Sequence, residues 1–309
     1  MVVIPFTVPG QKLLIDMNDM MIIDNFRLSA GAVLINEEQQ TVCLIRDNTS
    51  GEYLLPKGGK KTFETLSNAA QREVFEETGY ENEVASEHLL GIQFRPNISG
   101  KPGEHKVVYW YYSKLTSNVF HDGTQDEGED FNSEWLLVED AIDKLNFEED
   151  KILVRRGFQT LLGTPLASHE ADLQRWNSEN QCIRMLTRPS TSIERGFLVT
   201  DVGRNKIILI RDCDTDSWKL PSESCIDSNM NLCGKPKDEC APFLFELKLD
   251  DEDVTVKQWY HLEVSYYDRI RERSVIAKDM LLIDKDDALK KLKNNLHEMN
   301  IVVSAFKKL

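Results

Sequence analysis

Residues 58–80 read GGKKTFETLSNAAQREVFEETGY, and this stretch determines most of what the sequence predicts. From its first glycine it fits the pattern G-x5-E-x7-R-E-U-x-E-E-x-G-U without a gap, where U is a bulky apolar residue. The fixed letters of the pattern fall on Gly58, Glu64, Arg72, Glu73, Glu76, Glu77 and Gly79. Because average residue usage gives each letter a chance of roughly 5–10%, a full match is expected about once in 10⁸ windows or fewer.

A helix is predicted over the second half of this stretch. Ser67 or Asn68 is a suitable N-cap, and AAQREVFEET contains good helix formers. Gly79 follows at the point where a left-handed C-terminal residue is favoured. We therefore expect one helix that ends at or just before this glycine.

Three glutamates share one face of the predicted helix. Glu73, Glu76 and Glu77 are related by i, i+3 and i+4. Carboxylates this close repel unless a countercharge is present, and hard oxygen ligands of this kind suit Mg²⁺ or Mn²⁺. Arg72 precedes the cluster and can orient one carboxylate through a bidentate contact. A solvated acidic helix surface is the alternative, and the register of the other fixed letters argues against it.

The loop before the helix, LLPKGGKK at residues 54–61, combines glycines with lysines. Gly58 and Gly59 permit positive φ angles and a close approach of the backbone to a ligand or metal. Three ammonium groups lie beside the expected phosphate position, those of Lys57, Lys60 and Lys61. For the last two, a solvated surface is an equal alternative.

Together these residues resemble the Nudix box, the signature of hydrolases that cleave a diphosphate linked to another moiety. The resemblance implies an α/β fold, namely a Nudix-type α/β/α sandwich with a mixed sheet. The implied metal ligands are the Gly58 carbonyl, Glu73 and Glu77, with Mg²⁺ or Mn²⁺ as the cofactor. Glu76 is implied as the general base or a further ligand.

The same resemblance implies that Glu64 and Arg72 hold the loop and the helix in register. The acidic loop GTQDEGED, residues 123–130, is a further candidate region. Its four acidic residues are Asp126, Glu127, Glu129 and Asp130. One of them can add a metal ligand or an alternative base, whereas a mobile solvated loop is the competing interpretation.

The prediction of the substrate depends on residues other than the three glutamates of the helix. PKGG at residues 56–59 resembles the start of the box in Nudix enzymes that act on diphosphoinositol polyphosphates and diadenosine polyphosphates. Those enzymes usually carry Val-Glu next, but this chain has Lys60-Lys61, which favours a highly anionic substrate. Pro96, sixteen residues past the box, resembles ADP-ribose-cleaving members and gives the alternative. The S-Q-P-W motif of NADH-cleaving members is absent.

The predicted substrate contacts are Lys57, Gly59, Lys60, Lys61, Arg46 and Arg95. Lys101, His105 and Lys106 lie along the same Pro/Gly-rich stretch as Arg95 and can also contact a polyphosphate, whereas an exposed loop with a few charges is an equal alternative for each of the four. A non-catalytic sensor of a nucleotide or an inositol pyrophosphate is the competing function.

The second half of the chain repeats the first. With an offset of 165, GAVLINEEQQTVCLIRDNTSGEYLLP (31–56) aligns without a gap on GFLVTDVGRNKIILIRDCDTDSWKLP (196–221). Later segments match with small gaps, namely 107–115 with 259–267 and 134–145 with 279–292. We therefore predict a tandem of two Nudix-like domains.

The second copy lacks the fixed residues of the box. At the same offset, Gly58 corresponds to Glu223, and the positions of Glu76 and Glu77 fall on alanine and proline. We expect residues 1–165 to form the catalytic domain, 166–181 a linker, and 182–309 a degenerate domain that packs on or regulates the first.

Composition limits the remaining possibilities. The 309-residue chain has a net charge of −15, which argues against general nucleic-acid binding. No apolar run approaches the roughly 18 residues that cross a membrane, and the N-terminal stretch lacks the features of a secretory signal. Six cysteines show no zinc spacing, although a knuckle among those at 213, 225, 233 and 240 is an alternative. We predict a cytoplasmic protein, with the nucleus as an alternative, whose partner is a small anionic phosphorylated substrate.

Overall fold

The chain separates into two units in the computed structural model. One is Phe26–Thr191, and the other combines Met1–Asn25 with Ser192–Leu309. The structure describes residues 7–8, 11–12, 14–16, 20–23, 26–62, 64–95, 105–164, 175–177, 182–187, 193–201, 203–212, 215, 217–223, 242–249, 254–264, 280–293 and 295–307. Pro96, Lys101 and the four cysteines of the suggested knuckle lie outside these residues.

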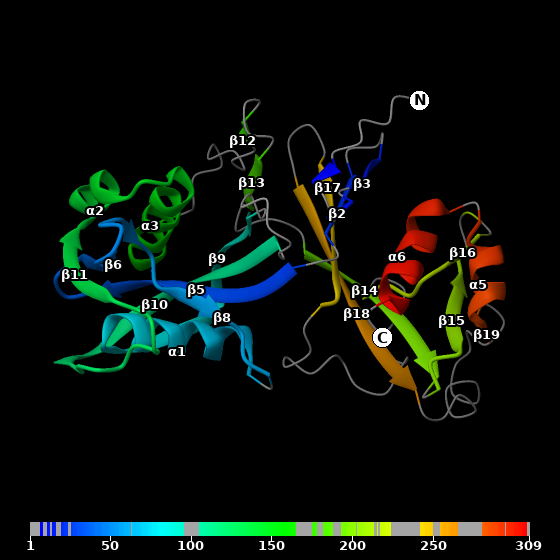
Figure 1. Ribbon diagram of the computed structural model, residues 1–309, viewed down its shortest axis with the longest axis horizontal. Coiled ribbons are helices and arrows are strands. Elements are labelled where there is room, and N and C mark those ends of the chain that lie inside the picture. The colour runs from blue at the N-terminus through cyan, green and yellow to red at the C-terminus, as the bar shows by residue number, and fades with distance from the viewer. Residues whose placement is uncertain are drawn as a thin grey trace. The chain divides into compact units, whose positions relative to one another are not determined.

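The unit Phe26–Thr191 is built on one mixed sheet (Figure 1). Its strand order is β11-β6-β5-β10-β9-β13-β12. The bounds are β5 Phe26–Asn36, β6 Thr41–Asp47, β9 Tyr80–Arg95, β10 His105–Phe120, β11 Phe131–Leu137, β12 Arg175–Asn177 and β13 Cys182–Leu186. The pair β5 and β10 is parallel, and the other pairs along this order are antiparallel. Two short strands extend the sheet, β7 (Tyr53–Leu54) beside β6 and β8 (Lys57–Gly59) beside β5.

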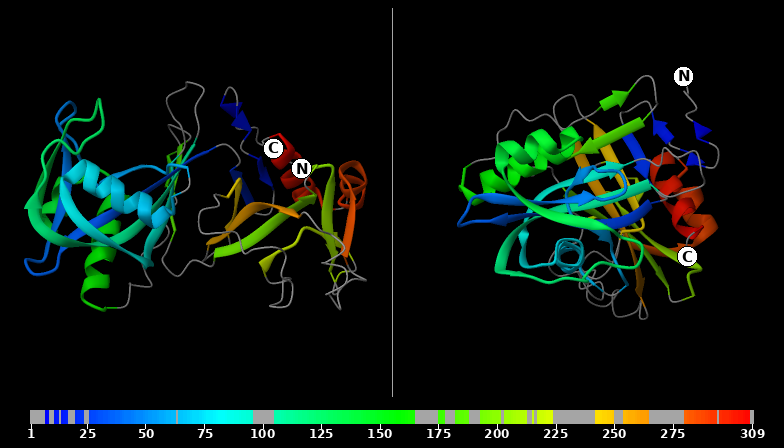
Figure 2. Two further views of the ribbon diagram at one scale, coloured as in Figure 1. Left: turned by 90° about the horizontal axis from the view of Figure 1, so that it is seen from below. Right: turned by 60° about the vertical axis from the view of Figure 1, so that its left-hand side comes forward.

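Helices cover both faces of this sheet, as Figures 1 and 2 show. Helix α1 (Leu66–Thr78) lies on one face, whereas α2 (Val138–Lys144) and α3 (Glu148–Leu161) lie on the other. Strand β10 explains why both faces are covered, because its residues from Val107 to Tyr112 are all buried. Alternate residues of a strand point to opposite faces, so an unbroken buried run needs apolar cover on both sides. The expected α/β class with a mixed sheet is confirmed.

Helix α1 begins two or three residues earlier than the sequence analysis expected. The N-cap is Thr65, not Ser67 or Asn68, because Thr65 has an extended backbone and its side chain accepts a hydrogen bond from the Asn68 N–H. Gly79 ends the helix in the left-handed conformation with φ 74°, as predicted. A Cβ there would lie 2.6 Å from the carbonyl oxygen of His121, so a larger residue would be excluded as well as strained.

The second unit contains a sheet with the order β16-β15-β14-β18-β17-β4-β3, and β19 pairs with β15. Its strands are β3 Leu14–Asp16, β4 Met20–Ile23, β14 Ile193–Asp201, β15 Lys206–Arg211, β16 Trp218–Lys219, β17 Leu244–Leu249, β18 Val254–Val264 and β19 Met280–Asp284. Its helices are α5 (Lys285–Lys291) and α6 (Leu296–Phe306), which pack on one face. A small separate ribbon joins β1 (Thr7–Val8) to β2 (Gln11–Lys12).

Two segments belong to a different sheet than the predicted domain boundaries implied. Strands β3 and β4, expected within the first domain, belong to the sheet of the second unit through β17. Strand β13, expected to open the second domain, pairs with β9 of the first. The edge of a sheet exposes unpaired backbone groups that any nearby segment can satisfy, so position along the chain does not decide which sheet a short strand joins.

The two sheets share a strand arrangement. The order β19-β15-β14-β18-β17 corresponds to β11-β6-β5-β10-β9, and each contains one parallel pair at the same place. Gly31 pairs with Trp110 in the first sheet, and Gly196 pairs with Trp259 in the second. A Cβ on either glycine would lie within 3 Å of the tryptophan ring, so both positions require glycine for the same reason.

Candidate active site

The loop and the helix of the box meet at Gly58. Strand β8 pairs with β5 through Ala30, which fixes Gly58 beside α1. A Cβ at Gly58 would lie 1.9 Å from Oε2 of Glu73. Only glycine therefore leaves room for that carboxylate against the loop.

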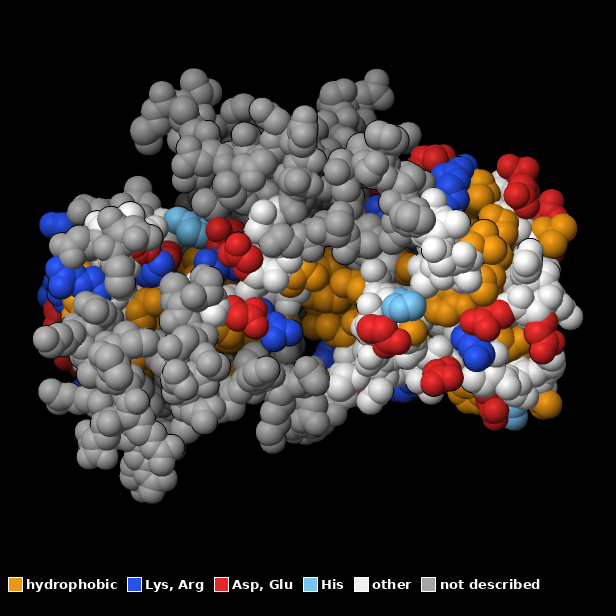
Figure 3. All heavy atoms as spheres, turned by 180° about the vertical axis from the view of Figure 1, so that it is seen from behind, with side chains coloured by type: hydrophobic (Ala, Val, Ile, Leu, Met, Phe, Trp, Pro, Cys, Tyr) orange, Lys and Arg blue, Asp and Glu red, His pale blue; other side chains and the backbone are white. Residues whose placement is uncertain are grey.

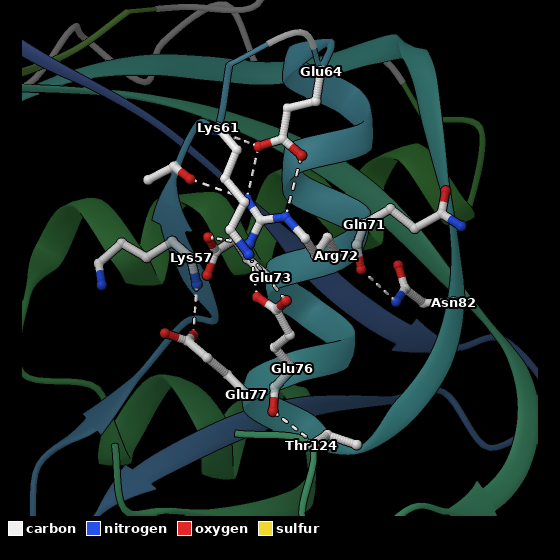
Figure 4. Close-up of polar contacts among 11 residues, drawn as sticks. Lys57, Lys61, Glu64, Gln71, Arg72, Glu73, Glu76, Glu77, Asn82 and Thr124 are labelled. Atoms are coloured by element: carbon white, nitrogen blue, oxygen red, sulfur yellow. Dashed lines mark hydrogen bonds and ion pairs between the residues drawn. The ribbon is translucent and has the colours of Figure 1, made fainter. Parts of the chain in front are cut away.

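Arg72 ties this loop to the helix (Figure 4). Its Nε and Nη2 donate to the two oxygens of Glu64 at 3.1 and 2.7 Å. Its Nη1 donates to Glu73 Oε1 at 2.6 Å and to Glu76 Oε2 at 2.7 Å, and its Nη2 also donates to the Gly59 carbonyl at 3.0 Å. Burial by itself would lower the pKa of Arg72, but these carboxylates raise it.

Glu64 and Arg72 were predicted to hold the loop and the helix in register. That role needs one group that contacts both segments, and the guanidinium of Arg72 contacts the loop and three carboxylates. Glu64 also accepts a hydrogen bond from the backbone N–H of Lys61. Burial alone would raise the pKa of Glu64, but the contacts from Arg72 and Lys61 lower it. Glu64 therefore stays ionised while it anchors both partners.

Glu73 and Glu77 are the buried carboxylates of the helix face, with 7% and 3% of their surface exposed. Glu77 Oε2 accepts a hydrogen bond of 2.7 Å from the backbone N–H of Lys57. Burial raises the pKa of Glu77 to about 8, the nearby charge and N–H of Lys57 oppose this shift, and Glu129 and Glu73 add to it. Burial likewise raises the pKa of Glu73, against the effect of Arg72. Burial is therefore the main reason that the pKa of each carboxyl group is raised.

Glu76 differs from these two because both of its oxygens contact cations. Oε2 accepts from Arg72, and Oε1 lies 3.4 Å from Nζ of Lys61. Its side chain is 18% exposed. Glu76 therefore lies at the open side of the cluster.

The acidic loop approaches this cluster at one residue. Among its four acidic side chains, the charge of Glu129 raises the pKa of both Glu73 and Glu77. Asp130 accepts a hydrogen bond from Asn48 instead, at 2.6 Å. Thr124 anchors the loop to α1 by donating to the backbone carbonyl of Glu76 at 2.8 Å. The loop is thus held at the carboxyl end of α1.

Comparison with known proteins identifies the domain that carries this cluster. Residues 25–156 match the model of the NUDIX domain. The chain contains a Nudix domain. This match confirms the expectation of an enzyme of the Nudix pyrophosphohydrolase class.

Several solved structures are similar to this Nudix domain. They include a Caenorhabditis elegans Ap4A hydrolase binary complex (23% identity, TM-score 0.37, 44% of this chain and 98% of that chain). They also include a NUDIX hydrolase from Nitrosomonas europaea (18%, 0.37, 44% and 90%) and one from Clostridium perfringens (16%, 0.34, 44% and 97%).

The residues predicted to contact the substrate do not all lie near the glutamate cluster. Lys57, Lys60 and Lys61 remain on the loop, where Lys60 Nζ donates to the Lys61 carbonyl. Arg46 is exposed on β6 and lies beside Gly51, at the hairpin that joins β6 to β7. The structure therefore does not bring Arg46 to the glutamate cluster.

Arg95 contacts a buried carboxylate and not the glutamates of the helix. Its Nε donates to Gln93 Oε1 at 2.8 Å, and its Nη2 donates to Asp150 Oδ1 at 3.2 Å. Arg27, which sequence analysis missed, lies closer to the loop. A Cβ on Gly59 would be 2.4 Å from its Nη2. Arg27 precedes both the box and the repeat, so no sequence pattern points to it.

The donor set of the Nudix domain fits a hard divalent cation in type, since it offers two buried carboxylates and a partly buried third beside a glycine loop. In the positions shown, no three acidic, histidine or cysteine side chains among the described residues converge to hold an ion. The contact of Glu73 with Arg72 explains part of this, because the guanidinium occupies one of its oxygens.

Proposed function

We propose that this protein hydrolyses a diphosphate linkage in a highly anionic substrate, with Mg²⁺ or Mn²⁺ as the cofactor. The observation that carries the proposal is that two buried carboxylates, Glu73 and Glu77, lie against the glycine loop of a Nudix domain. Substrate phosphates complete the coordination of such cations in many enzymes.

In this proposal Glu73, Glu77 and the Gly58 carbonyl hold the metal. When bound, the cation neutralises the diphosphate and makes a water more acidic. Arg72 keeps the helix and the loop in register through its contacts with Glu64 and the Gly59 carbonyl.

Glu76 accepts the proton of the attacking water in the proposed reaction, as the resemblance implied. Glu129 is the second candidate for this role. It lies within electrostatic reach of Glu73 and Glu77, and no cation contacts it among the described side chains, whereas Arg72 and Lys61 contact Glu76. A base must lie near the water in the substrate complex, so Glu76→Gln and Glu129→Gln separate the two by their effect on kcat.

For the substrate we propose a diphosphoinositol polyphosphate or a diadenosine polyphosphate, with ADP-ribose as the alternative. The lysines of the loop support the first class, and Arg27 adds a cation beside Gly59. The chain carries a net charge of −15, and on the coloured part of Figure 3 basic side chains are interspersed with acidic ones. Attraction of an anionic substrate therefore depends on local cations and the metal.

A panel of the three substrate classes with Mg²⁺ tests this function. We expect turnover of at least one polyphosphate, with a higher kcat/KM than for ADP-ribose. Chelation by EDTA should lower the rate by at least about 1,000-fold, because the cation supplies both charge neutralisation and water activation. Restored Mg²⁺ is the control. If the substrates bind but none is cleaved, the sensor function replaces the enzyme.

We further propose that the second unit, Ser192–Leu309 with the N-terminal segment Met1–Asn25, forms a degenerate Nudix-like copy without catalytic chemistry. The shared strand order and the Gly–Trp pairs support this interpretation. Among the described residues of this copy, the buried carboxylates are Glu246 and Glu298. The roles assigned to each domain, their packing and the cellular compartment stay predictions. No helix in the described part of the chain has the length and apolarity to span a bilayer.

Substitution of those two carboxylates tests the degenerate copy. We expect Glu246→Gln and Glu298→Gln to leave kcat/KM within about twofold of wild type when each variant is folded, since neither contacts a metal or substrate in this proposal. Circular dichroism checks the fold. A loss comparable to that of Glu77→Gln would show that the second unit takes part in the reaction.

A further inference from the structure

Three basic residues lie side by side across three strands of the first sheet. Lys106 on β10 pairs with Arg27 on β5 and with Arg95 on β9. Residues directly opposite one another on neighbouring strands point to the same face. Like charges in this arrangement are destabilising, so a row of three cations needs an explanation beyond the fold.

Lys57 belongs to the same cluster. It pairs with Gly31, four residues after Arg27 on β5, and therefore points to the same face. Lys106 is exposed, but partial burial of its charged group lowers its pKa, and the charges of Lys57, Arg95 and Arg27 lower it further. The other three cations are thus all within electrostatic reach of Lys106.

The charge of this cluster is only partly balanced. Arg95 is paired with Asp150, which is 1% exposed, and is therefore fixed in the row. Arg27, Lys57 and Lys106 have no carboxylate within ion-pair distance among the residues that the structure describes. Among the described residues, these three side chains therefore face one side of the sheet without an ion pair, although the charge of Lys57 acts on Glu77.

Strand β8 connects the cation row to the glutamate cluster. Its residues alternate, so Gly58 is beside Glu73 while Gly59 is beside Arg27. A Cβ on Gly59 would clash with the Arg27 guanidinium, just as a Cβ on Gly58 would clash with Glu73. In the described sheet β8 pairs only with β5, and the backbone N–H of Lys57 on β8 donates to Glu77 instead of to a strand.

The strand order of this fold does not require a lysine at the position of Lys106, as the second sheet shows. Thr255 stands four residues before Trp259 on β18, and Lys106 stands four residues before Trp110 on β10. The second sheet thus has the same strand order with a neutral residue at this position.

We propose that Arg27, Lys57 and Lys106 form an anion subsite that binds a phosphate group of the substrate other than the scissile diphosphate. Arg95 is a positioning residue that Asp150 holds in the row. This inference rests on the proposed function and narrows its substrate class, because the charges of ADP-ribose all belong to its scissile diphosphate. Phosphate monoesters on a ring and further phosphates in a chain both supply the required anion.

Kinetics of the full-length double variant Arg27→Gln/Lys106→Gln test the subsite. Charge-assisted hydrogen bonds to phosphate are strong, so we expect KM for a diphosphoinositol or diadenosine polyphosphate to rise by about 10- to 100-fold. The kcat should stay within about threefold, and KM for ADP-ribose within about twofold. An equal change for all three substrates, or no change, would overturn the subsite.

Binding without turnover separates this inference from the proposed function. Calorimetry in EDTA would measure inorganic tripolyphosphate, a linear anion, and inositol hexakisphosphate, a ring of monoesters. We expect wild type to bind at least one of them, the double variant to bind it at least about tenfold more weakly, and salt to weaken binding. The probe that loses more affinity identifies the source of the phosphate. Equal affinity of variant and wild type would refute the subsite even if hydrolysis is confirmed.

The matched control is Lys114→Gln. Lys114 lies on the same strand as Lys106, is half exposed, and is 4.0 Å from Glu37. Its loss removes one positive charge, as the single variant Lys106→Gln does. Unchanged probe affinity in Lys114→Gln beside weaker binding in Lys106→Gln would exclude an effect of net charge alone.

Discussion

Glu77→Gln should lower kcat/KM for a diphosphate substrate by at least about 1,000-fold, because a neutral amide replaces a charged ligand of the catalytic cation. The substitution preserves shape, and the amide oxygen can still accept the hydrogen bond from the Lys57 N–H. Loss of activity with a retained fold would therefore report the charge of Glu77. Steady-state kinetics at several Mg²⁺ concentrations would measure it, and activity equal to that of wild type would contradict the ligand assignment.

The same variant has a second expected effect, on the pH dependence of stability. In metal-free protein the pKa of Glu77 is raised from 4.5 to about 8. The unfolded chain therefore releases this proton near pH 4.5, whereas the folded chain keeps it until about pH 8. Between these values the unfolded state binds fewer protons, so the free energy of unfolding falls as pH rises.

Urea denaturation of the metal-free protein between pH 5 and pH 9 would measure this contribution. Wild type should lose stability over that window, and Glu77→Gln should lose less, because its amide does not titrate. Glu73 has a raised pKa as well, so part of the slope should remain in the variant. If the free energy of unfolding fell equally with pH in both proteins, the raised pKa of Glu77 would be contradicted.

Arg72→Ala should impair both stability and catalysis. The guanidinium contacts Glu64, Glu73, Glu76 and the Gly59 carbonyl, and its side chain is 20% exposed. Its removal leaves three carboxylates repelling one another, at a cost of about 2–4 kcal/mol in the free energy of unfolding after allowance for solvent screening. We also expect kcat to fall by at least about 100-fold, because the loop and the helix lose their common anchor.

Arg72→Lys distinguishes the charge from the geometry. Lysine keeps the positive charge but cannot reproduce the forked contacts, so it should recover part of the stability and little of the kcat. Arg204→Ala is the matched control, since Arg204 forms an exposed ion pair with Glu263 at 2.8 Å in the second unit. Its cost should stay below about 1 kcal/mol. If Arg72→Ala unfolds no more easily than this control, the anchoring role is wrong.

The helix and its cluster were predictable because they depend on local spacing. An α-helix places residues at i, i+3 and i+4 on one face wherever it lies in a fold, so Glu73, Glu76 and Glu77 were expected together. The left-handed end at Gly79 follows from the same local rules. Even here the N-cap was placed two or three residues late, because Ser67 and Asn68 are capping types too and only the backbone conformation of Thr65 decides between them.

The partners of this cluster were not predictable, because they arrive from distant segments. Glu129 reaches Glu73 and Glu77 through a loop that is anchored at Thr124. The exposed position of Arg46 at its hairpin depends equally on how β6 and β7 pair. Spacing along the chain carries no information on such contacts.

The sequence by itself determined the reaction class and the repeat, since both reside in contiguous patterns, the box at residues 58–80 and the gapless match at an offset of 165. Only the tertiary structure brought Arg27 beside Lys106 and Lys106 beside Arg95. It also assigned β13 to the first sheet and β3 and β4 to the second. The physical reason is the same in each case: the register of a sheet is set by hydrogen bonds between distant strands, and a shift of one residue would turn every one of these side chains to the other face.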